Sequence, residues 1–406
     1  MITDDRIILG LLAAVLAFVF VTRARPSWSR FYTFVPIILV AYLLPSLMVT
    51  FGLIDVTDSN LWPVAKDYFL PAALFLMTLS IDLKGVIGLG PKALIMFFTA
   101  TIGIVIGGPI ALYIVAQFDP AIVSEGSSAA WRGLATLAGS WIGGGANQTA
   151  MLEIYQFDIS QYSALIAVDI IVANIWMAFL LYGAGASTRM DRWLRADSSA
   201  IDALRDKMAN YTSSVERVAS GNDYVLLFGT TFAAVGLCHL LAGPLGAFFA
   251  GLNGDDSVLA SQFFWVVLFA TTFGLAASFT RARALEGVGA SKFGTVFIFL
   301  LVAVIGTKMD VTQIAETPGY MAIGVIWMLI HTILLLAVAW MIRAPFFFVA
   351  VGSKANVGGA ASAPVVASAF HPALAPVGVL LAVLGYAVGT YGAILCAEMM
   401  RAVSGG

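Results

Sequence analysis

Long apolar runs separated by short polar stretches dominate the hydropathy pattern of the chain. A helix needs about 20 apolar residues to cross a hydrocarbon core of roughly 30 Å, and ten runs meet that demand. The predicted spans are 6–22, 31–53, 66–82, 92–118, 160–183, 223–250, 261–280, 292–307, 317–342 and 374–400. The pattern therefore predicts an all-α polytopic membrane protein.

Two glycine-rich stretches, 128–156 and 345–371, interrupt this pattern. Each is too short for two full crossings and carries small and polar residues near its middle, as in "GSWIGGGANQTA" at 139–150. Irregular backbone at membrane depth is tolerated only inside protein or beside water. Each stretch is therefore predicted to be a re-entrant hairpin or a broken crossing helix.

The distribution of basic residues favours hairpins. If both stretches leave by the side they enter, most lysines and arginines fall on one side of the membrane, as cytoplasmic loops require. The loop 184–222 then contributes Arg189, Arg192, Arg195, Arg205, Lys207 and Arg217 to that side. We expect this loop in the cytoplasm, both termini outside, and the protein in a bacterial inner membrane.

Composition agrees with a membrane protein and excludes several functions. The 406 residues are 60% hydrophobic and 11% charged, with a mean hydropathy of +0.95, far from soluble domains. A net charge of −2 without a basic patch argues against a nucleic-acid partner. Cys238 and Cys396 lie in apolar runs without metal-ligand spacing. The acidic start "MITDDR" favours a retained first span over a cleaved signal.

The break motif recurs, since "IGGGAN" at 142–147 answers "VGGAAS" at 357–362. A second pair, "SIDLKGV" at 80–86 and "TKMDVTQI" at 307–314, puts Asp82 and Asp310 at the ends of equivalent spans. Each half then has five spans and one hairpin, so the second half is inserted upside down, as in many secondary transporters. We predict inverted repeats at 1–183 and 223–406, joined by an amphipathic cytoplasmic linker at 184–222.

Four blocks resemble a bacterial membrane family of unknown function, the domain-of-unknown-function family 819. They are "GSWIGGGANQTA", "GTKMDVTQIAETP", "APFFFVAVGSKANVGGAASAPV" and "VLLAVLGYAVGTYGAIL". The family is distantly similar to the bile-acid/sodium and sodium/glutamate symporter folds. The resemblance implies a scaffold (spans one, two, six and seven) and a mobile core (the other spans and both hairpins), moving by an elevator mechanism. At the second hairpin, Lys354 stands where the family pattern has asparagine, and Ala360 where it has proline.

Charged and polar residues at depth mark a candidate site. Asp169 lies about nine residues into its span, near the bilayer centre, where a carboxylate is costly and therefore functional by default. Lys354 is its expected partner, and His239 and His331 are expected to bond neighbouring helices. The predicted substrate- or ion-binding residues are Ser140, Gly143, Gly144, Gly145, Asn147, Gln148, Thr149, Asp169, Asn174, Ser353, Lys354, Asn356, Gly358, Gly359 and Ser362. A coupling Na⁺ is expected near Asn147, Asp169 and Asn356.

These features favour an ion-coupled secondary active transporter, driven by Na⁺ or H⁺, for a small polar or anionic solute. A cation/proton antiporter using Asp169 and a passive channel are the alternatives. An enzyme would need a nucleophile and base or a metal cluster at depth, and the sequence has no such motif, so none is expected. No other cofactor is predicted. The expected partners are the solute, the lipid bilayer and a second copy, bound through the scaffold helices as a homodimer.

Overall fold

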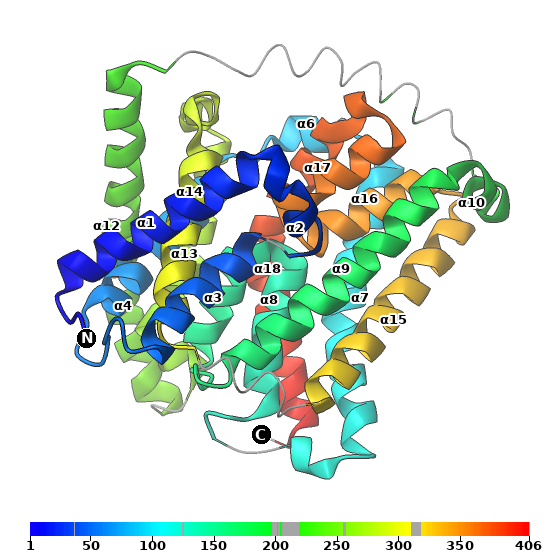
Figure 1. Ribbon diagram of the computed structural model, residues 1–406. Helices are drawn as coiled ribbons and strands as arrows, with labels where there is room; N and C mark the ends of the chain where they lie inside the picture. Colours follow the sequence, from blue (N-terminus) through cyan, green and yellow to red (C-terminus); the bar gives the residue numbers. More distant parts are fainter. Residues whose placement is uncertain are drawn as a thin grey trace.

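A computed structural model describes residues 1–35, 37–123, 126–196, 201, 204, 219–254, 257–309 and 318–405. These residues are nearly all helical and form seventeen α-helices (Figure 1). Long apolar runs form helices in lipid because a helix satisfies its own backbone hydrogen bonds. The predicted all-α fold class is confirmed.

The helices of the first half run from the N-terminus to the predicted linker. They are α1 (Asp5–Ala24), α2 (Ser29–Phe34), α3 (Ile37–Thr50), α4 (Leu61–Val64), α5 (Leu70–Leu79), α6 (Leu83–Ile87), α7 (Pro91–Ala116), α8 (Ala130–Ile154), α9 (Tyr162–Gly185) and α10 (Ser187–Leu194). A short π-helix, η2 (Ala65–Phe69), joins α4 to α5.

The second half begins with the longest helix. Its helices are α12 (Gly221–Asn253), α13 (Gln262–Ser278), α14 (Ala290–Gly306), α15 (Pro318–Met341), α16 (Phe346–Asn356), α17 (Gly359–Phe370) and α18 (Ala375–Val403). The start of α12 is fixed by a capping box, in which Ser220 and Asp223 each accept the other's backbone N–H.

Fewer helices than the ten predicted spans are individually long enough to cross a membrane. Within the described residues, six helices are long and apolar enough, or up to eight if each of two sharply bent helix pairs counts as one span. Each predicted span does contain a helix, but α3, α5, α13 and α14 are only 14, 10, 17 and 17 residues long. Hydropathy counts the apolar residues of a bent segment together and cannot show the bend.

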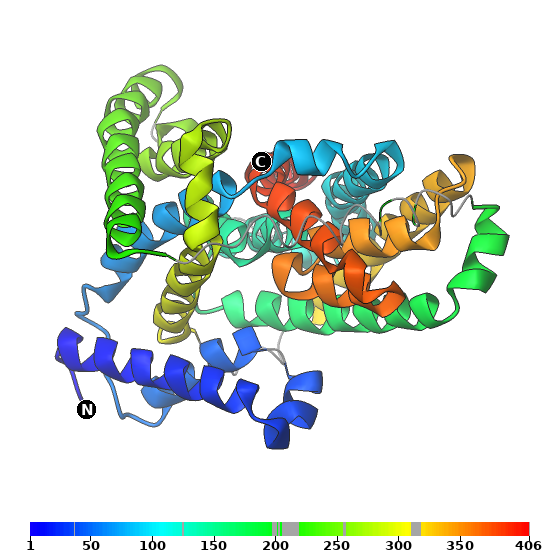
Figure 2. The ribbon, with the colours of Figure 1, turned by 90° about the horizontal axis from the view of Figure 1, so that it is seen from above.

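The helices pack as two bodies that lie side by side (Figure 2). The first body contains α1, α3, α5, α12, α13 and α14, and the second contains α7, α8, α9, α15, α16, α17 and α18. Each half of the chain contributes its first three spans to the first body, and its last two spans and its glycine-rich stretch to the second.

In this division α5 and α14, the third and eighth spans, which the resemblance assigns to the core, pack with the first body. α14 packs against α3 and α5, and its Phe297 ring stacks on Phe69 with the ring centroids 5.5 Å apart. The Ser46 hydroxyl of α3 donates to the Met309 carbonyl just after α14, at 2.9 Å. These contacts bind α14 to the other first-body helices, and the short α5 lies between α13 and α14.

The linker and one predicted acidic position are described only in part. α10 occupies the start of the 184–222 segment, and α12 begins near its end. Most of the predicted amphipathic region (197–200, 202–203 and 205–218) lies outside the described residues. Asp310 also lies outside them, so its equivalence with Asp82 stays a prediction.

Candidate functional site

The first glycine-rich stretch is a helical hairpin. α8 reverses direction at Gly144, where φ is 72° and ψ is −169°, a conformation open to glycine. The Trp131 and Tyr155 rings lie 5.3 Å apart, and Arg132 donates to the Tyr155 carbonyl at 2.5 Å. In a continuous helix these residues would be about 36 Å apart. The segment therefore returns to the end at which it entered.

The second glycine-rich stretch is also a helical hairpin. α16 ends at Asn356, and α17 begins after Gly358, whose φ is 115°. The rings of Phe347 and Phe370, at the open ends of the two limbs, lie 5.3 Å apart. The two segments that the sequence singled out share one architecture, and both have glycine at the reversal.

The two hairpins approach α18 from opposite ends. Tyr155, at the open end of the first hairpin, donates to Glu398 near the C-terminal end of α18 at 3.0 Å. The open end of the second hairpin leads through a short 3₁₀ turn into the start of α18. α18 has 29 residues and is therefore about 43 Å long. In Figure 1, α16 and α17 lie toward one end of the molecule, and α8 extends toward the end that carries the C-terminus.

Both hairpins meet α18 near its middle, at Gly385. A Cβ atom at this position would lie 2.9 Å from the Ile142 carbonyl oxygen and 3.2 Å from the Ala355 carbonyl oxygen. The first distance is shorter than real Cβ contacts, and the second is tighter than most of them. Glycine at this position therefore lets the backbones of the two hairpins approach one helix together.

A buried asparagine holds each hairpin by the same set of hydrogen bonds. In the first hairpin, the Asn147 amide donates to the carbonyls of Gly143 and Tyr386, and its oxygen accepts from Thr390 of α18. In the second hairpin, the Asn356 amide donates to the carbonyls of Gly352 and Phe97, and its oxygen accepts from Thr101 of α7. Each asparagine thus joins its hairpin to a long helix.

These bonds correct one detail of the sequence repeat. Aligning 142–147 with 357–362 pairs Asn147 with Ser362, but the hydrogen-bond pattern pairs Asn147 with Asn356. The side-chain oxygens of both asparagines accept hydrogen bonds from threonines and so fasten helices together. The Na⁺ site expected near them stays a prediction.

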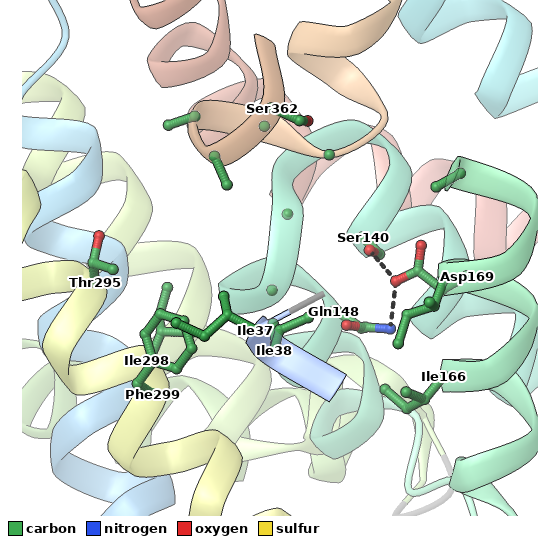
Figure 3. Close-up of a pocket in the computed structure, with 18 of the residues that line it drawn as sticks. Ile37, Ile38, Ser140, Gln148, Ile166, Asp169, Thr295, Ile298, Phe299 and Ser362 are labelled. Carbon is green, nitrogen blue, oxygen red and sulfur yellow. Dashed lines mark hydrogen bonds between the residues drawn. The ribbon is translucent and has the colours of Figure 1, made fainter. Parts of the chain in front are cut away.

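A cavity of about 460 Å³ lies between the two bodies, at the tips of both hairpins. Apolar side chains of α3, α5 and α14 form one wall, while α8, α9 and the second hairpin form the other. Figure 3 shows Ile298 and Phe299 on one side, Asp169 and Gln148 on the opposite side, and Ser362 on the second hairpin. The first wall is thus mostly apolar, and the two charged side chains of the lining, Asp169 and Lys354, both lie on the second wall, which we call the polar wall.

Asp169 lies on the polar wall, on α9, where the first hairpin supplies its hydrogen-bond donors. Its carboxylate accepts from the Ser140 hydroxyl at 2.6 Å, from the Trp141 indole at 2.8 Å and from the Gln148 amide at 3.3 Å. Ser140 and Gln148 lie on opposite limbs of the hairpin, four residues on either side of Gly144. The carboxylate therefore ties both limbs to α9.

Lys354 also lines the cavity, but it does not form the predicted ion pair with Asp169. Its ammonium donates to the backbone carbonyl of Ala173, one turn along α9, at 3.1 Å. Within the described part of the chain, no ion pair within 4.0 Å joins the two side chains. Lys354 belongs to α16, which packs against α9 one turn beyond Asp169. Its ammonium therefore lies on the face of α9 that carries the Asp169 carboxylate. Its side chain is only 2% exposed.

Ser353, next to Lys354, belongs to a buried chain of hydrogen bonds. The Trp176 indole donates to the Ser353 hydroxyl at 2.8 Å, and the same hydroxyl lies 2.8 Å from His331 Nε2. His331 Nδ1 lies 3.1 Å from the Ala100 carbonyl and must donate to it, so a neutral ring accepts from Ser353 at Nε2. The chain joins α7, α9, α15 and the second hairpin, in line with the expectation for His331.

The predicted site residues divide into two groups. Ten line the cavity: Ser140, Gly144, Gly145, Gln148, Asp169, Asn174, Lys354, Gly358, Gly359 and Ser362. The other five belong to the hairpins but lie outside the lining of the cavity: Gly143, Asn147, Thr149, Ser353 and Asn356. The prediction missed the apolar wall, whose residues are Ile37, Ile38, Met77, Ile298 and Phe299, and also missed Tyr42 and Tyr386. No sequence signal separates these side chains from lipid-facing ones.

Comparison with known protein families assigns the chain to one of them. A family model described as "Protein of unknown function (DUF819)" matches residues 10–403. The chain belongs to the DUF819 family. The match extends from α1 into α18, so both hairpins and the whole cavity lining lie within the family region.

A curated relative agrees with this assignment. The chain is 22% identical over 347 residues to "Uncharacterized membrane protein YjcL" of Bacillus subtilis (strain 168), covering 82% of each protein. The family indicated by the four sequence blocks is confirmed. With its apolar helices, the chain is a polytopic helical membrane protein of this family.

Proposed function

We propose that this protein is a secondary active transporter that couples the movement of a small polar or anionic solute to Na⁺ or H⁺. The observation that carries the proposal is the cavity between two helical bodies, bounded by two hairpin tips that arrive from opposite ends of α18. Discontinuous segments that meet at a shared central site are typical of secondary transporters.

The packing of the bodies supports alternating access by relative movement. One cavity wall belongs to the first body, and the other wall, with both hairpins, belongs to the second. Sliding the second body along α3 and α14 would carry the polar wall with it and leave the apolar wall in place. The Lys66–Glu153 ion pair, with 3.5 Å between nitrogen and oxygen, links η2 to the first hairpin and would have to separate. We therefore favour an elevator movement, with the first body as scaffold.

Asp169 is the residue proposed to carry the coupling. A carboxylate in a low-dielectric cavity strongly favours binding a cation or a proton, because its isolated charge is costly there. Its three hydrogen-bond donors belong to the first hairpin. Neutralising or occupying the carboxylate would therefore change how firmly α9 holds that hairpin.

The proposed similarity to the bile-acid/sodium and sodium/glutamate symporter folds fits this mechanism. The chain would then have inverted repeats, a cytoplasmic linker and outside termini in the bacterial inner membrane, and would act without enzymatic activity as a homodimer joined through first-body helices. Cation/proton antiport is the second candidate, because a carboxylate and an ammonium lie one helical turn apart on one cavity wall.

Reconstitution into liposomes tests the proposal. Vesicles with a pH gradient or a Na⁺ gradient are exposed to a panel of labelled small carboxylates, amino acids and neutral solutes, and uptake is measured with and without each gradient. Wild type and Asp58→Asn, a change on an exposed loop, should accumulate a solute, whereas Asp169→Asn should lose gradient-driven accumulation. Equal gradient-driven uptake by Asp169→Asn would refute the coupling role. Uptake that never exceeds equilibrium would indicate a channel.

A further inference from the structure

The two walls of the cavity fit different chemical groups of a ligand. Ile37, Ile38, Met77, Ile298 and Phe299 form most of the apolar wall, to which Tyr42 and Thr295 add two hydroxyl groups. In Figure 3, Ile298 and Phe299 lie across the cavity from the polar side chains. A ligand that contacted this wall with a charged group would lose hydration without compensation. The wall therefore fits an apolar part of the ligand.

The opposite wall carries the Lys354 ammonium, which lies near the Asp169 carboxylate but not within the 4.0 Å of an ion pair. An ammonium has three N–H donors, and Lys354 directs one of them to the Ala173 carbonyl. None of the ion pairs found in the described part of the chain involves Lys354. A buried ammonium is costly unless an anion or several acceptors compensate it. The cavity beside Lys354 therefore favours an acceptor, and above all an anion.

The first turn of α17 adds donors on the same side. Residues 358–362 all line the cavity. The N-cap residue of α17, Gly358, has no side chain that could cap the helix start, so the first N–H groups have no acceptor within the helix, and the Tyr386 hydroxyl takes up the Ala360 N–H. The Ser362 hydroxyl oxygen is buried there without a hydrogen-bond partner. Lys354, this hydroxyl and the helix start thus form one group of donors around the tip of the second hairpin.

Asp169 limits how much negative charge the cavity accepts. Its carboxylate lines the same wall, beside Lys354. One carboxylate and one ammonium leave the wall without net charge, so a dianion would place its second charge against Asp169 or against the apolar wall. A monoanion has one charged group, which Lys354 can hold, and the uncharged remainder of the ligand can then face the apolar wall.

We propose that the cavity binds a small organic monoanion, a carboxylate that carries a short aliphatic group. The carboxylate lies against Lys354, Ser362 and the first turn of α17, and the aliphatic group lies against Ile298 and Phe299. A volume of about 460 Å³ equals roughly fifteen waters at about 30 Å³ each, enough for a branched acid with its remaining hydration. This inference rests on the proposed transport function and names its substrate class.

Calorimetric titration of the purified full chain tests the charge requirement. The probes are 3-methylbutanoate, its neutral analogue 3-methylbutanamide, and the dianion succinate. We expect wild type to bind 3-methylbutanoate at least tenfold more tightly than the other two. Lys354→Gln should weaken this binding at least tenfold. The matched control is Lys92→Gln, because Lys92 also donates to a backbone carbonyl at 3.1 Å but lies outside the cavity lining.

A second variant keeps the test decisive if Lys354→Gln fails to fold. Phe299→Ala should weaken 3-methylbutanoate several-fold and leave acetate, which has almost no aliphatic group, unchanged. The proposal is overturned if the amide or the dianion binds as tightly as the monoanion, if no monoanion binds, or if either cavity variant binds 3-methylbutanoate like wild type.

The transport assay separates the two proposals. Gradient-driven uptake of a cation or a neutral solute, without monoanion binding, would refute the substrate class and keep the transport function. Tight monoanion binding without gradient-driven uptake in liposomes would keep the site and refute the transport function.

Discussion

Removing the buried asparagine of either hairpin should destabilise the protein by a similar amount. Asn147→Ala deletes three hydrogen bonds, to Gly143, Tyr386 and Thr390. Asn356→Ala deletes the corresponding three bonds of the second hairpin. Both asparagine side chains are fully buried, so water cannot replace the lost partners.

The magnitude follows from the number of bonds and their setting. Hydrogen bonds between membrane helices contribute roughly 0.6 kcal/mol each, with a maximum near 1.7 kcal/mol. In each variant two of the three bonds join different helices, and the third goes to the carbonyl four residues earlier in the same hairpin. Two bonds between helices predict a loss of about 1 kcal/mol for each variant. Because the two sites share no hydrogen-bond partner, the double variant should lose about 2 kcal/mol, the sum expected for independent sites.

Equilibrium unfolding in mixed micelles, with the denaturing detergent as titrant, measures these losses. The control is Asn174→Ala, since Asn174 is exposed and its amide bonds only the Ile170 carbonyl of its own helix. We expect the control to change stability by less than about 0.5 kcal/mol. The reasoning fails if the control costs as much as the two hairpin variants, or if one hairpin variant costs less than about 0.5 kcal/mol.

Three further predictions concern the backbone, pH dependence and topology. Gly144→Ala should cost about 1–3 kcal/mol of unfolding free energy through its positive φ, and Gly145→Ala, where a Cβ meets nothing closer than 3.6 Å, should cost far less; equal losses would contradict this. Burial raises the pKa of the Asp191 carboxyl, which a backbone N–H bond partly offsets. Because this pKa is higher in the folded protein than in the unfolded chain, the charged carboxylate destabilises the fold at pH values above the folded pKa. The destabilisation disappears as the pH falls through the folded pKa toward the unfolded one. Asp191→Asn should therefore raise the melting temperature at pH 7.5, with a gain that shrinks toward pH 4; a gain that grows at low pH would reverse the sign. A cysteine at Thr188 should be protected from an impermeant thiol reagent in intact cells and one at Asp58 labelled, and the opposite result would invert the topology.

The sequence predicted the hairpins because their signal is unusual in a membrane chain. Three consecutive glycines beside Asn147 cannot serve an ordinary lipid-facing helix, and neither can Lys354 beside Asn356. The sequence could not show on which side of each reversal a polar residue falls. Asn147 follows its reversal and Asn356 precedes its own, so aligning the glycines paired the wrong residues.

Other parts of the site left no distinctive signal. Ile298 and Phe299 have the same hydropathy whether they face lipid or a cavity. A single threonine such as Thr101 or Thr390 can bond a carbonyl of its own helix, so nothing in the sequence indicated that each holds a hairpin. The opposite charges of Lys354 and Asp169 predict an ion pair between them. The register of α16 against α9 instead brings the ammonium to the Ala173 carbonyl oxygen.

The bonds between the first hairpin and α18 have a consequence for biogenesis. The ribosome completes α8 at residue 154, whereas Tyr386 and Thr390 emerge more than 200 residues later. Until α18 is inserted, Asn147 lacks the Tyr386 and Thr390 partners that it has in the mature protein. The nascent first half must therefore keep a polar hairpin away from lipid for most of synthesis, sheltered by the insertion machinery or by temporary contacts. A chain that stops before α18 would lack these two partners of Asn147 permanently, so completing the first hairpin depends on the last helix of the protein.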